Sequence, residues 1–204
     1  MISRLGYIKR VSVDKYKKQG RGGTGSNSTN LLENDYINQL FIGSTKEYLL
    51  FITNTGRAYW IKIHEIPESE KNSRGANIKG LLQVSADEEI TTIVSLKEFS
   101  DDQYLFMTTA NGIVKKVRSS EFQNAKTKGI IGIKLNDGDK LISAIATKGD
   151  SQVMLITRRG KALRITEDSV RLMGRASCGI KGMKLSEGDE IAAAVKVESD
   201  SNII

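Results

Sequence analysis

The chain has 204 residues, of which 39% are hydrophobic and 27% are charged, and its formal net charge is +7. These proportions are typical of a globular protein, and the longest apolar runs are far too short for a membrane helix. The single His and the single Cys exclude a Cys/His zinc cluster and an internal disulfide, so no metal site is expected and a His-dependent catalytic role would rest on His64.

The first 25 residues are strongly basic. They contain seven Lys and Arg residues against Asp14, a net charge of +6, whereas the rest of the chain carries +1. A positive field this concentrated attracts a polyanion, and because the sequence shows no amphipathic helix suited to a lipid surface, it favours nucleic acid over a membrane. A solvated basic face without a partner is the alternative interpretation.

Four hairpin motifs recur along the chain. Their anchor glycines are Gly6, Gly56, Gly112 and Gly160, at spacings of 50, 56 and 48 residues. A short apolar run precedes each glycine and an alternating run follows it, which is typical of two strands joined by a tight turn. Glycine suits such a turn because it adopts a positive φ without strain.

A second, glycine-rich signature follows in the later repeats. It is clearest at 128–135 and 178–185 and weaker at 74–81, and an acidic turn and a closing apolar strand come after it. In the last repeat we expect four strands within one blade, at 153–157, 161–166, 180–185 and 190–197. The period of two in the apolar runs argues against substantial helix.

These patterns predict a single all-β, propeller-like domain over residues 1–204, built of four-stranded blades that stabilise one another. About four blades are visible. The approximate repeats are 1–47, 48–103, 104–151 and 152–202, with 203–204 opening a further repeat.

The segment from Gln19 to Gly25 resembles two nucleotide-binding motifs only superficially. It fits G-x-G-x-x-G literally, but the flanking residues indicate neither the preceding strand nor the following helix that a dinucleotide site needs. The Walker pattern fails because Ser26 and Asn27 stand where Lys and Ser or Thr are required. The segment is better interpreted as a flexible loop whose cations and backbone N–H groups can lie along a phosphate backbone.

This heptapeptide resembles the GyrA box, which marks the C-terminal domain of the DNA gyrase A family of type IIA topoisomerases. The residues Gly6 to Val11, Asp14 and Tyr16 precede the box in the order and spacing of the family's first blade. The usual box reads Gln-Arg-Arg-Gly-Gly-Lys-Gly, so this copy has Gly20 in place of Arg and Thr24 in place of Lys. With two cations fewer, the loop should attract DNA less strongly.

The resemblance implies a six-bladed β-pinwheel whose positively charged rim binds double-stranded DNA and wraps it. In that family the domain directs negative supercoiling by a holoenzyme that uses ATP and Mg, so the implied partners are DNA, the N-terminal part of gyrase A and the gyrase B protein. No cofactor and no catalytic site are expected in this chain. The resemblance and the lone Cys178 favour the bacterial cytoplasm, in association with the nucleoid.

The candidate DNA-binding residues lie at the box, near the hairpins and in the long loops that follow them. We expect the cations of successive units to share one convex edge, with the carboxylates gathered at the acidic turns elsewhere, and we expect phosphate contacts with little sequence preference. The candidates are Arg4, Lys9, Arg10, Lys17, Lys18, Gln19, Gly20, Arg21, Gly22, Gly23, Thr24, Gly25, Arg57, Arg74, Lys115, Lys116, Lys128, Arg158, Arg159 and Arg175.

Three alternatives to the gyrase-type domain stay open at this point. One is the related C-terminal domain of topoisomerase IV, in which the box is usually degenerate or missing. Another is a propeller-like protein-interaction module, although Trp-Asp and kelch-like signatures are absent. The third is an enzyme on a propeller scaffold, which the single His disfavours.

Overall fold

The computed structural model describes residues 1–16, 21–22 and 30–197, and it shows an all-β protein. The described strands are β1 (Ile2–Ser3), β2 (Tyr7–Ile8), β3 (Ile37–Gln39), β4 (Tyr48–Thr53), β5 (Arg57–Lys62), β6 (Ala76–Asn77), β7 (Ile90–Leu96), β8 (Tyr104–Thr109), β9 (Ile113–Arg118), β10 (Ile130–Ile131), β11 (Leu141–Thr147), β12 (Gln152–Thr157), β13 (Ala162–Thr166), β14 (Ile180–Lys181) and β15 (Ile191–Val197). The described helices are one short α-helix, α1 (Ile78–Leu81), and the 3-10 turns η1 (Val13–Lys15), η2 (Ile63–Glu65), η3 (Ser119–Phe122), η4 (Lys126–Lys128) and η5 (Glu167–Ser169). The all-β prediction is confirmed.

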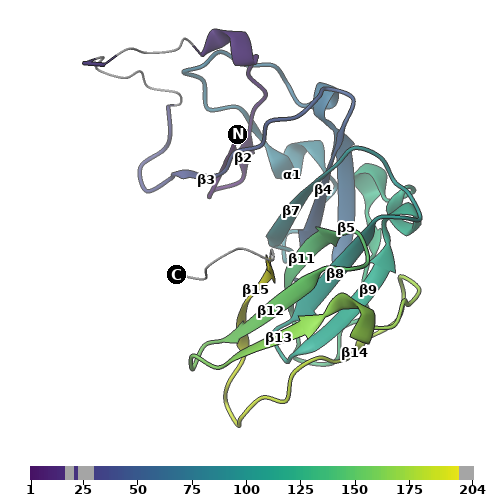
Figure 1. Ribbon diagram of the computed structural model, residues 1–204. Coiled ribbons are helices and arrows are strands. Elements are labelled where there is room, and N and C mark those ends of the chain that lie inside the picture. The colour runs from purple at the N-terminus through teal and green to yellow at the C-terminus, as the bar shows by residue number, and fades with distance from the viewer. Residues whose placement is uncertain (17–20, 23–29, 198–204) are drawn as a thin grey trace.

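The strands form four antiparallel sheets that follow one another along the chain, from the purple N-terminal sheet to the yellow-green C-terminal one (Figure 1). Their strand orders are β3-β1-β2-β6, β10-β5-β4-β7, β11-β8-β9-β14 and β13-β12-β15. Each four-stranded sheet takes three strands from one repeat and its outermost strand from the next repeat. We call β6, β10 and β14 the outer strands.

The prediction that all four strands of a repeat share one blade is therefore wrong. The strand expected at 180–185 is only two residues long, and it pairs with β9 of the preceding repeat, with Ile180 opposite Val114. The glycine-rich signature explains the exchange physically. A Cβ atom on Gly179 would lie 2.7 Å from the Val114 carbonyl oxygen, and its φ is +96°, so only glycine allows the segment to approach this closely.

The second, third and fourth sheets meet through the last strands of their repeats. β11 lies between β7 and β15, with hydrogen bonds from the Ala144 N–H to the Thr92 hydroxyl (3.3 Å) and from the Ser143 hydroxyl to the Ala194 carbonyl (3.4 Å). Strands β7, β11 and β15 thus form the inner side of the stack. The second strand of each hairpin and the outer strands lie on the opposite, outer side.

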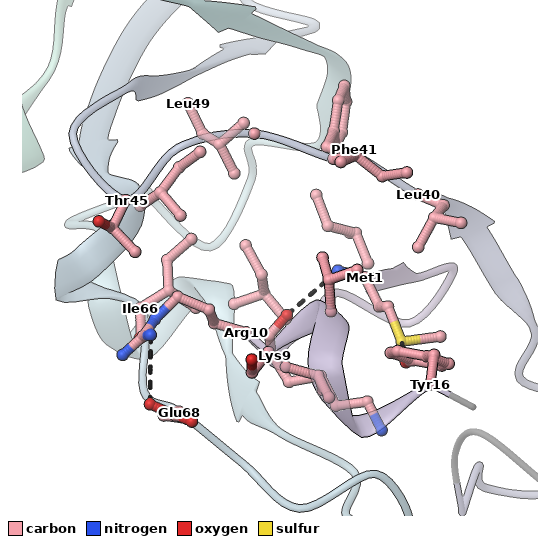
Figure 2. A pocket seen from close by; sticks show the side chains of 18 of the residues that line it. Met1, Lys9, Arg10, Tyr16, Leu40, Phe41, Thr45, Leu49, Ile66 and Glu68 are labelled. Carbon is pink, nitrogen blue, oxygen red and sulfur yellow. Dashed lines mark hydrogen bonds and ion pairs between the residues drawn. The ribbon is translucent and has the colours of Figure 1, made fainter. Parts of the chain in front are cut away.

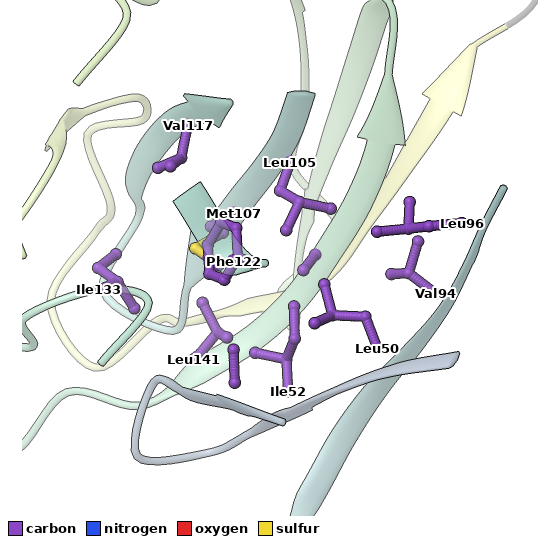
Figure 3. Close-up of a cluster of buried hydrophobic side chains, with 12 residues drawn as sticks. Leu50, Ile52, Val94, Leu96, Leu105, Met107, Val117, Phe122, Ile133 and Leu141 are labelled. Atoms are coloured by element: carbon purple, nitrogen blue, oxygen red, sulfur yellow. The ribbon is translucent and has the colours of Figure 1, made fainter. Parts of the chain in front are cut away.

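The hydrophobic core is divided into three clusters, one between each pair of neighbouring sheets. The middle cluster joins Leu50, Ile52 and Leu96 of the second repeat to Leu105 and Met107 of the third (Figure 3). Because each cluster combines side chains of two neighbouring sheets, the blades stabilise one another as predicted.

The predicted hairpins are confirmed, with one further detail. In each repeat a buried Ser or Thr hydroxyl accepts the backbone N–H of the residue four positions later, across the turn. The anchor glycine between them has a φ between 78° and 82°. These four bonds are Tyr7 to Ser3 (3.2 Å), Arg57 to Thr53 (3.3 Å), Ile113 to Thr109 (3.2 Å) and Lys161 to Thr157 (3.2 Å).

Candidate nucleic-acid interface

Three of the predicted DNA-binding lysines are buried. Lys9 is 3% exposed, Lys115 is 0% exposed and Lys116 is 9% exposed. The prediction that these side chains contact DNA directly is therefore wrong. The expectation that cations of successive units share one exposed convex edge is also wrong for Lys9 and Lys116. The reason is that β9, which holds Lys115 and Lys116, is buried on both faces, and that Lys9, directly after β2, is covered by the segment that holds Lys71 and Ser73.

The buried lysines donate to backbone carbonyls. The Lys9 ammonium donates to the carbonyls of Lys71 and Ser73, both at 2.7 Å. The Lys116 ammonium donates to the Glu167 carbonyl at 3.2 Å and lies 5.5 Å from the centre of the Tyr104 ring. Hydrogen bonds of this kind compensate the cost of burying a charge.

Lys115 has the most enclosed environment of the three. Its ammonium donates to the carbonyls of Gly132 and Ser177, each at 3.0 Å, and to that of Arg175. Burial lowers the pKa of Lys115 to about 8. At neutral pH the group therefore still carries the three N–H donors that match three carbonyl acceptors.

Arg57 is only partly available to a ligand. Its Nε donates to the Tyr59 hydroxyl at 3.1 Å and forms an ion pair with Glu88 at 3.4 Å. Its Nη2 donates to the carbonyls of Lys128 (3.2 Å) and Gly129 (3.3 Å) in the next repeat. The side chain thus bridges two repeats.

Arg10 and Arg175 are held in a similar way. Arg10 pairs with Glu68 at 3.2 Å and donates from Nε to the Ile66 carbonyl. Arg175 donates from Nη1 to the Ile131 carbonyl at 2.8 Å. Both cations are half-buried between segments of neighbouring repeats.

The acidic turns are bonded to the hairpins and do not lie apart from them. In three repeats an aspartate Oδ1 accepts one N–H from the hairpin and one from the residue that follows the aspartate. The hairpin bonds are Leu5 to Asp35 (3.0 Å), Asn111 to Asp139 (3.0 Å) and Arg159 to Asp189 (3.2 Å). Burial alone would raise the pKa of Asp189, but hydrogen bonds from Thr157, Arg159 and Glu190 outweigh it and hold this pKa below its usual value.

This arrangement corrects the expected separation of charges. Arg158 forms an ion pair with Glu190, and Arg159 donates from Nη1 to the Glu187 carbonyl at 3.0 Å. These two arginines, which are exposed, therefore share their end of the blade with the acidic turn.

Exposed cations do recur on the outer side, with at least two at each outer strand. Arg74 and Lys128 come just before β6 and β10, and Lys181 lies on β14. Lys79, Lys134, Lys181 and Lys184 were not among the predicted residues, although their positions in the repeated glycine-rich signature could have indicated them. We call six of these exposed cations, two from each outer strand, the rim cations: Arg74, Lys79, Lys128, Lys134, Lys181 and Lys184.

The remaining predicted residues lie in or near the first blade. Arg4 is exposed and stacks over Tyr36 at 5.9 Å. Arg21 and Gly22 of the box are exposed, and Gly22 has a φ of +81°. The other predicted residues at the box fall outside the described part of the chain: Lys17, Lys18, Gln19, Gly20, Gly23, Thr24 and Gly25.

A cavity of about 780 Å³ lies between the first two blades (Figure 2). Apolar side chains dominate its lining, among them Leu40, Phe41 and Leu49, and the Arg10–Glu68 ion pair lies at its edge. His64 is exposed and lies outside this lining. Residues 1–16, 21–22 and 30–197 contain no group of three side chains that could hold a metal ion. Within the same ranges, no helix is long and apolar enough to cross a membrane.

Comparison with known proteins gives consistent matches. The family model of the DNA gyrase C-terminal domain, a β-propeller, matches residues 1–44, 47–97, 103–148 and 151–198. The DNA gyrase A protein of Treponema pallidum is 56% identical over 177 residues, which are 87% of this chain and 22% of that protein. The chain thus spans about a fifth of the length of this curated relative.

Solved structures agree with this match. A DNA gyrase A C-terminal domain is 36% identical with a TM-score of 0.74, covering 97% of this chain and 64% of the other. The C-terminal domain of a DNA topoisomerase IV is 29% identical with a TM-score of 0.83, covering 97% of this chain and 60% of the other.

Proposed function

The chain belongs to the family of DNA gyrase C-terminal domains, and on that basis we propose that it binds double-stranded DNA through the rim cations and bends the duplex around the outer side of its blades. The observation that carries this proposal is the recurrence of exposed cations at three successive outer strands. Sharp bending of 20–30 bp costs on the order of several kcal/mol, and contacts repeated along a curved surface can offset that cost.

The proposed contacts are to phosphates. Lys and Arg side chains on short, exposed segments reach the DNA backbone but present no fixed array to the base edges. The rim therefore binds with little sequence preference, and the exposed Arg21 of the box adds to it. Arg4, Arg158 and Arg159, which are exposed beside the hairpins, play a secondary part.

We also propose that the chain acts as part of a gyrase A protein. In this view it works with the N-terminal part of that protein and with gyrase B in the bacterial cytoplasm, and the ATP, the Mg and the strand-cleaving chemistry belong to those other parts. The chain itself then contributes binding and bending and no catalytic group. The likeness to the topoisomerase IV domain keeps the corresponding domain of a topoisomerase IV protein as the second candidate.

The salt dependence of binding tests the rim directly. Affinity for a linear duplex of about 20 bp should fall with salt with a log–log slope near −0.9 for each phosphate contacted. Combining Lys128→Gln, Lys134→Gln and Lys184→Gln should reduce the size of that slope by about 2 to 3.

A matched control variant removes three positive charges from the inner side of the stack. Lys97, Lys148 and Lys196 are exposed on or beside the inner strands β7, β11 and β15. Changing these three to Gln should leave the slope within about one contact of the original. Equal losses in the two triple variants would show that net charge, and not the rim, determines binding.

A further inference from the structure

One position carries a side chain with a shared structural task in the first three repeats. The third residue after the anchor glycine is Lys9, Tyr59, Lys115 or Leu163 in the four repeats. The first three side chains are almost completely buried, with Tyr59 only 1% exposed. Leu163, on the sheet that has no outer strand among the described residues, is 38% exposed.

At the first and third junctions the buried lysines hold the segment that leads into an outer strand. The carbonyls that bind Lys9 belong to Lys71 and Ser73, a few residues before β6. Those of Arg175 and Ser177, which bind Lys115, come a few residues before β14. In both cases an ammonium from one repeat gathers backbone oxygens of the next repeat at a single point.

At the second junction different side chains do the same work. Gly129 lies against the Tyr59 ring so closely that a Cβ atom would be 2.3 Å from a ring carbon. The Tyr59 hydroxyl donates to the buried Glu88 carboxylate at 2.7 Å, and Arg57 donates to the carbonyls of Lys128 and Gly129. The segment before β10 is thus held by packing of Gly129 against the Tyr59 ring and by the hydrogen bonds from Arg57.

We call these contacts of Lys9, Lys115 and the Arg57–Tyr59 pair the ties between repeats. They matter because the outer strands are very short. Each of β6, β10 and β14 has two residues, and two ladder pairs alone restrain a segment weakly. The rim cations lie on or beside these same segments. Their spacing therefore depends on the buried side chains that fix the segments to the preceding blade.

We propose that Lys9, Lys115 and the Arg57–Tyr59 pair are positioning residues, which hold each outer strand on the preceding blade and so set the spacing of the rim cations without touching DNA. This inference rests on the proposed function. A short, straight duplex needs only a few neighbouring cations, whereas a bent duplex needs cations in fixed relative positions on several blades. Loss of a tie should therefore impair wrapping far more than binding.

The test compares Lys115→Met with the unchanged chain. One measurement is affinity for a linear duplex of about 20 bp, which is too short to follow several blades. The other is the linking-number shift that the chain imposes on nicked circular DNA when the nick is sealed. We expect the affinity of Lys115→Met to stay within about twofold and its linking-number shift to fall at least about threefold, since the buried carbonyls lose their donor.

Two further variants separate positioning from general stability. Leu155→Ala removes a buried side chain from the third hydrophobic cluster and leaves every tie in place, so it should lower the melting temperature and keep the shift. Lys115→Arg keeps a cationic donor and should restore more of the shift than Lys115→Met does. If Lys115→Met does not fold, Arg57→Met makes the same comparison at the less enclosed second junction.

The outcomes distinguish this inference from the proposed function. A folded Lys115→Met or Arg57→Met variant that keeps the full shift overturns the positioning role alone. So does a loss of shift that Leu155→Ala reproduces at equal stability. An unchanged chain that binds DNA but produces no shift overturns both the proposed wrapping and the inference that rests on it.

Discussion

Three aspartates of the acidic turns bond to the protein's own backbone. Asp35, Asp139 and Asp189 each accept two N–H bonds and so fasten an acidic turn to a hairpin. In the second repeat Glu88 stands in their place and bonds to Tyr59 and Arg57, while the Asn54 side chain accepts the N–H of Glu89. These four acidic groups are therefore engaged within the fold of a chain whose net charge is positive.

The Asp189 carboxylate should make the free energy of unfolding depend on pH in the acidic range. Because its pKa in the folded chain lies below the unfolded value, the charge contributes stability above about pH 4, and that contribution is lost as pH falls through the folded pKa. Free energies of unfolding of the unchanged chain and of Asp189→Asn, measured from pH 7 to pH 2, should converge below about pH 4. A difference that stays constant over this range would contradict the assignment.

At the same scale, the sequence predicts hairpin glycines well and buried cations badly. Gly6, Gly56, Gly112 and Gly160 are recognisable because a tight turn needs a local positive φ. Lys115 is not recognisable as buried, since its acceptors on Arg175 and Ser177 lie 60 and 62 residues away in sequence. An alternating run with lysines is typical of a solvated edge unless a distant segment covers it.

At the scale of elements, the exchanged outer strand is the feature that defines the blade. The repeats are similar to one another in sequence. The apolar pattern of the third strand in a repeat therefore suits pairing with the edge of its own sheet and with the edge of the preceding sheet equally well. Sequence could therefore predict the strands and their order but not which sheet each outer strand joins. The deciding information is steric, at Gly75, Gly129 and Gly179, and it becomes visible only in three dimensions.

The exchange makes a sharp prediction for glycine substitutions. Gly179→Ala places a Cβ atom 2.7 Å from the Val114 carbonyl oxygen at a φ of +96°, so we expect a loss of about 2 kcal/mol or more in the free energy of unfolding. Gly174→Ala is the matched control, because a Cβ there meets nothing within 4 Å. Chemical denaturation of both variants checks this. Equal stabilities would show that β14 does not pack against β9 as closely as described.

At the scale of the whole molecule, three hydrophobic clusters and the exchanged strands join successive sheets into one stack. The inner strands β7, β11 and β15 bring neighbouring sheets together, and the rim cations lie at the opposite side. A structure of this kind suits a template that imposes its own curvature on a duplex, since its stiffness comes from burial and its attraction comes from surface charge.

The proposed function requires that the rim cations bend DNA and do not merely attract it. The linking-number shift on nicked circular DNA, sealed in the presence of the chain, measures this directly. We predict a clear shift for the unchanged chain, its loss when Lys128, Lys134 and Lys184 are changed to Gln, and its retention when Lys97, Lys148 and Lys196 are changed instead. Tight binding with no shift, or equal shifts in the two triple variants, would contradict the account.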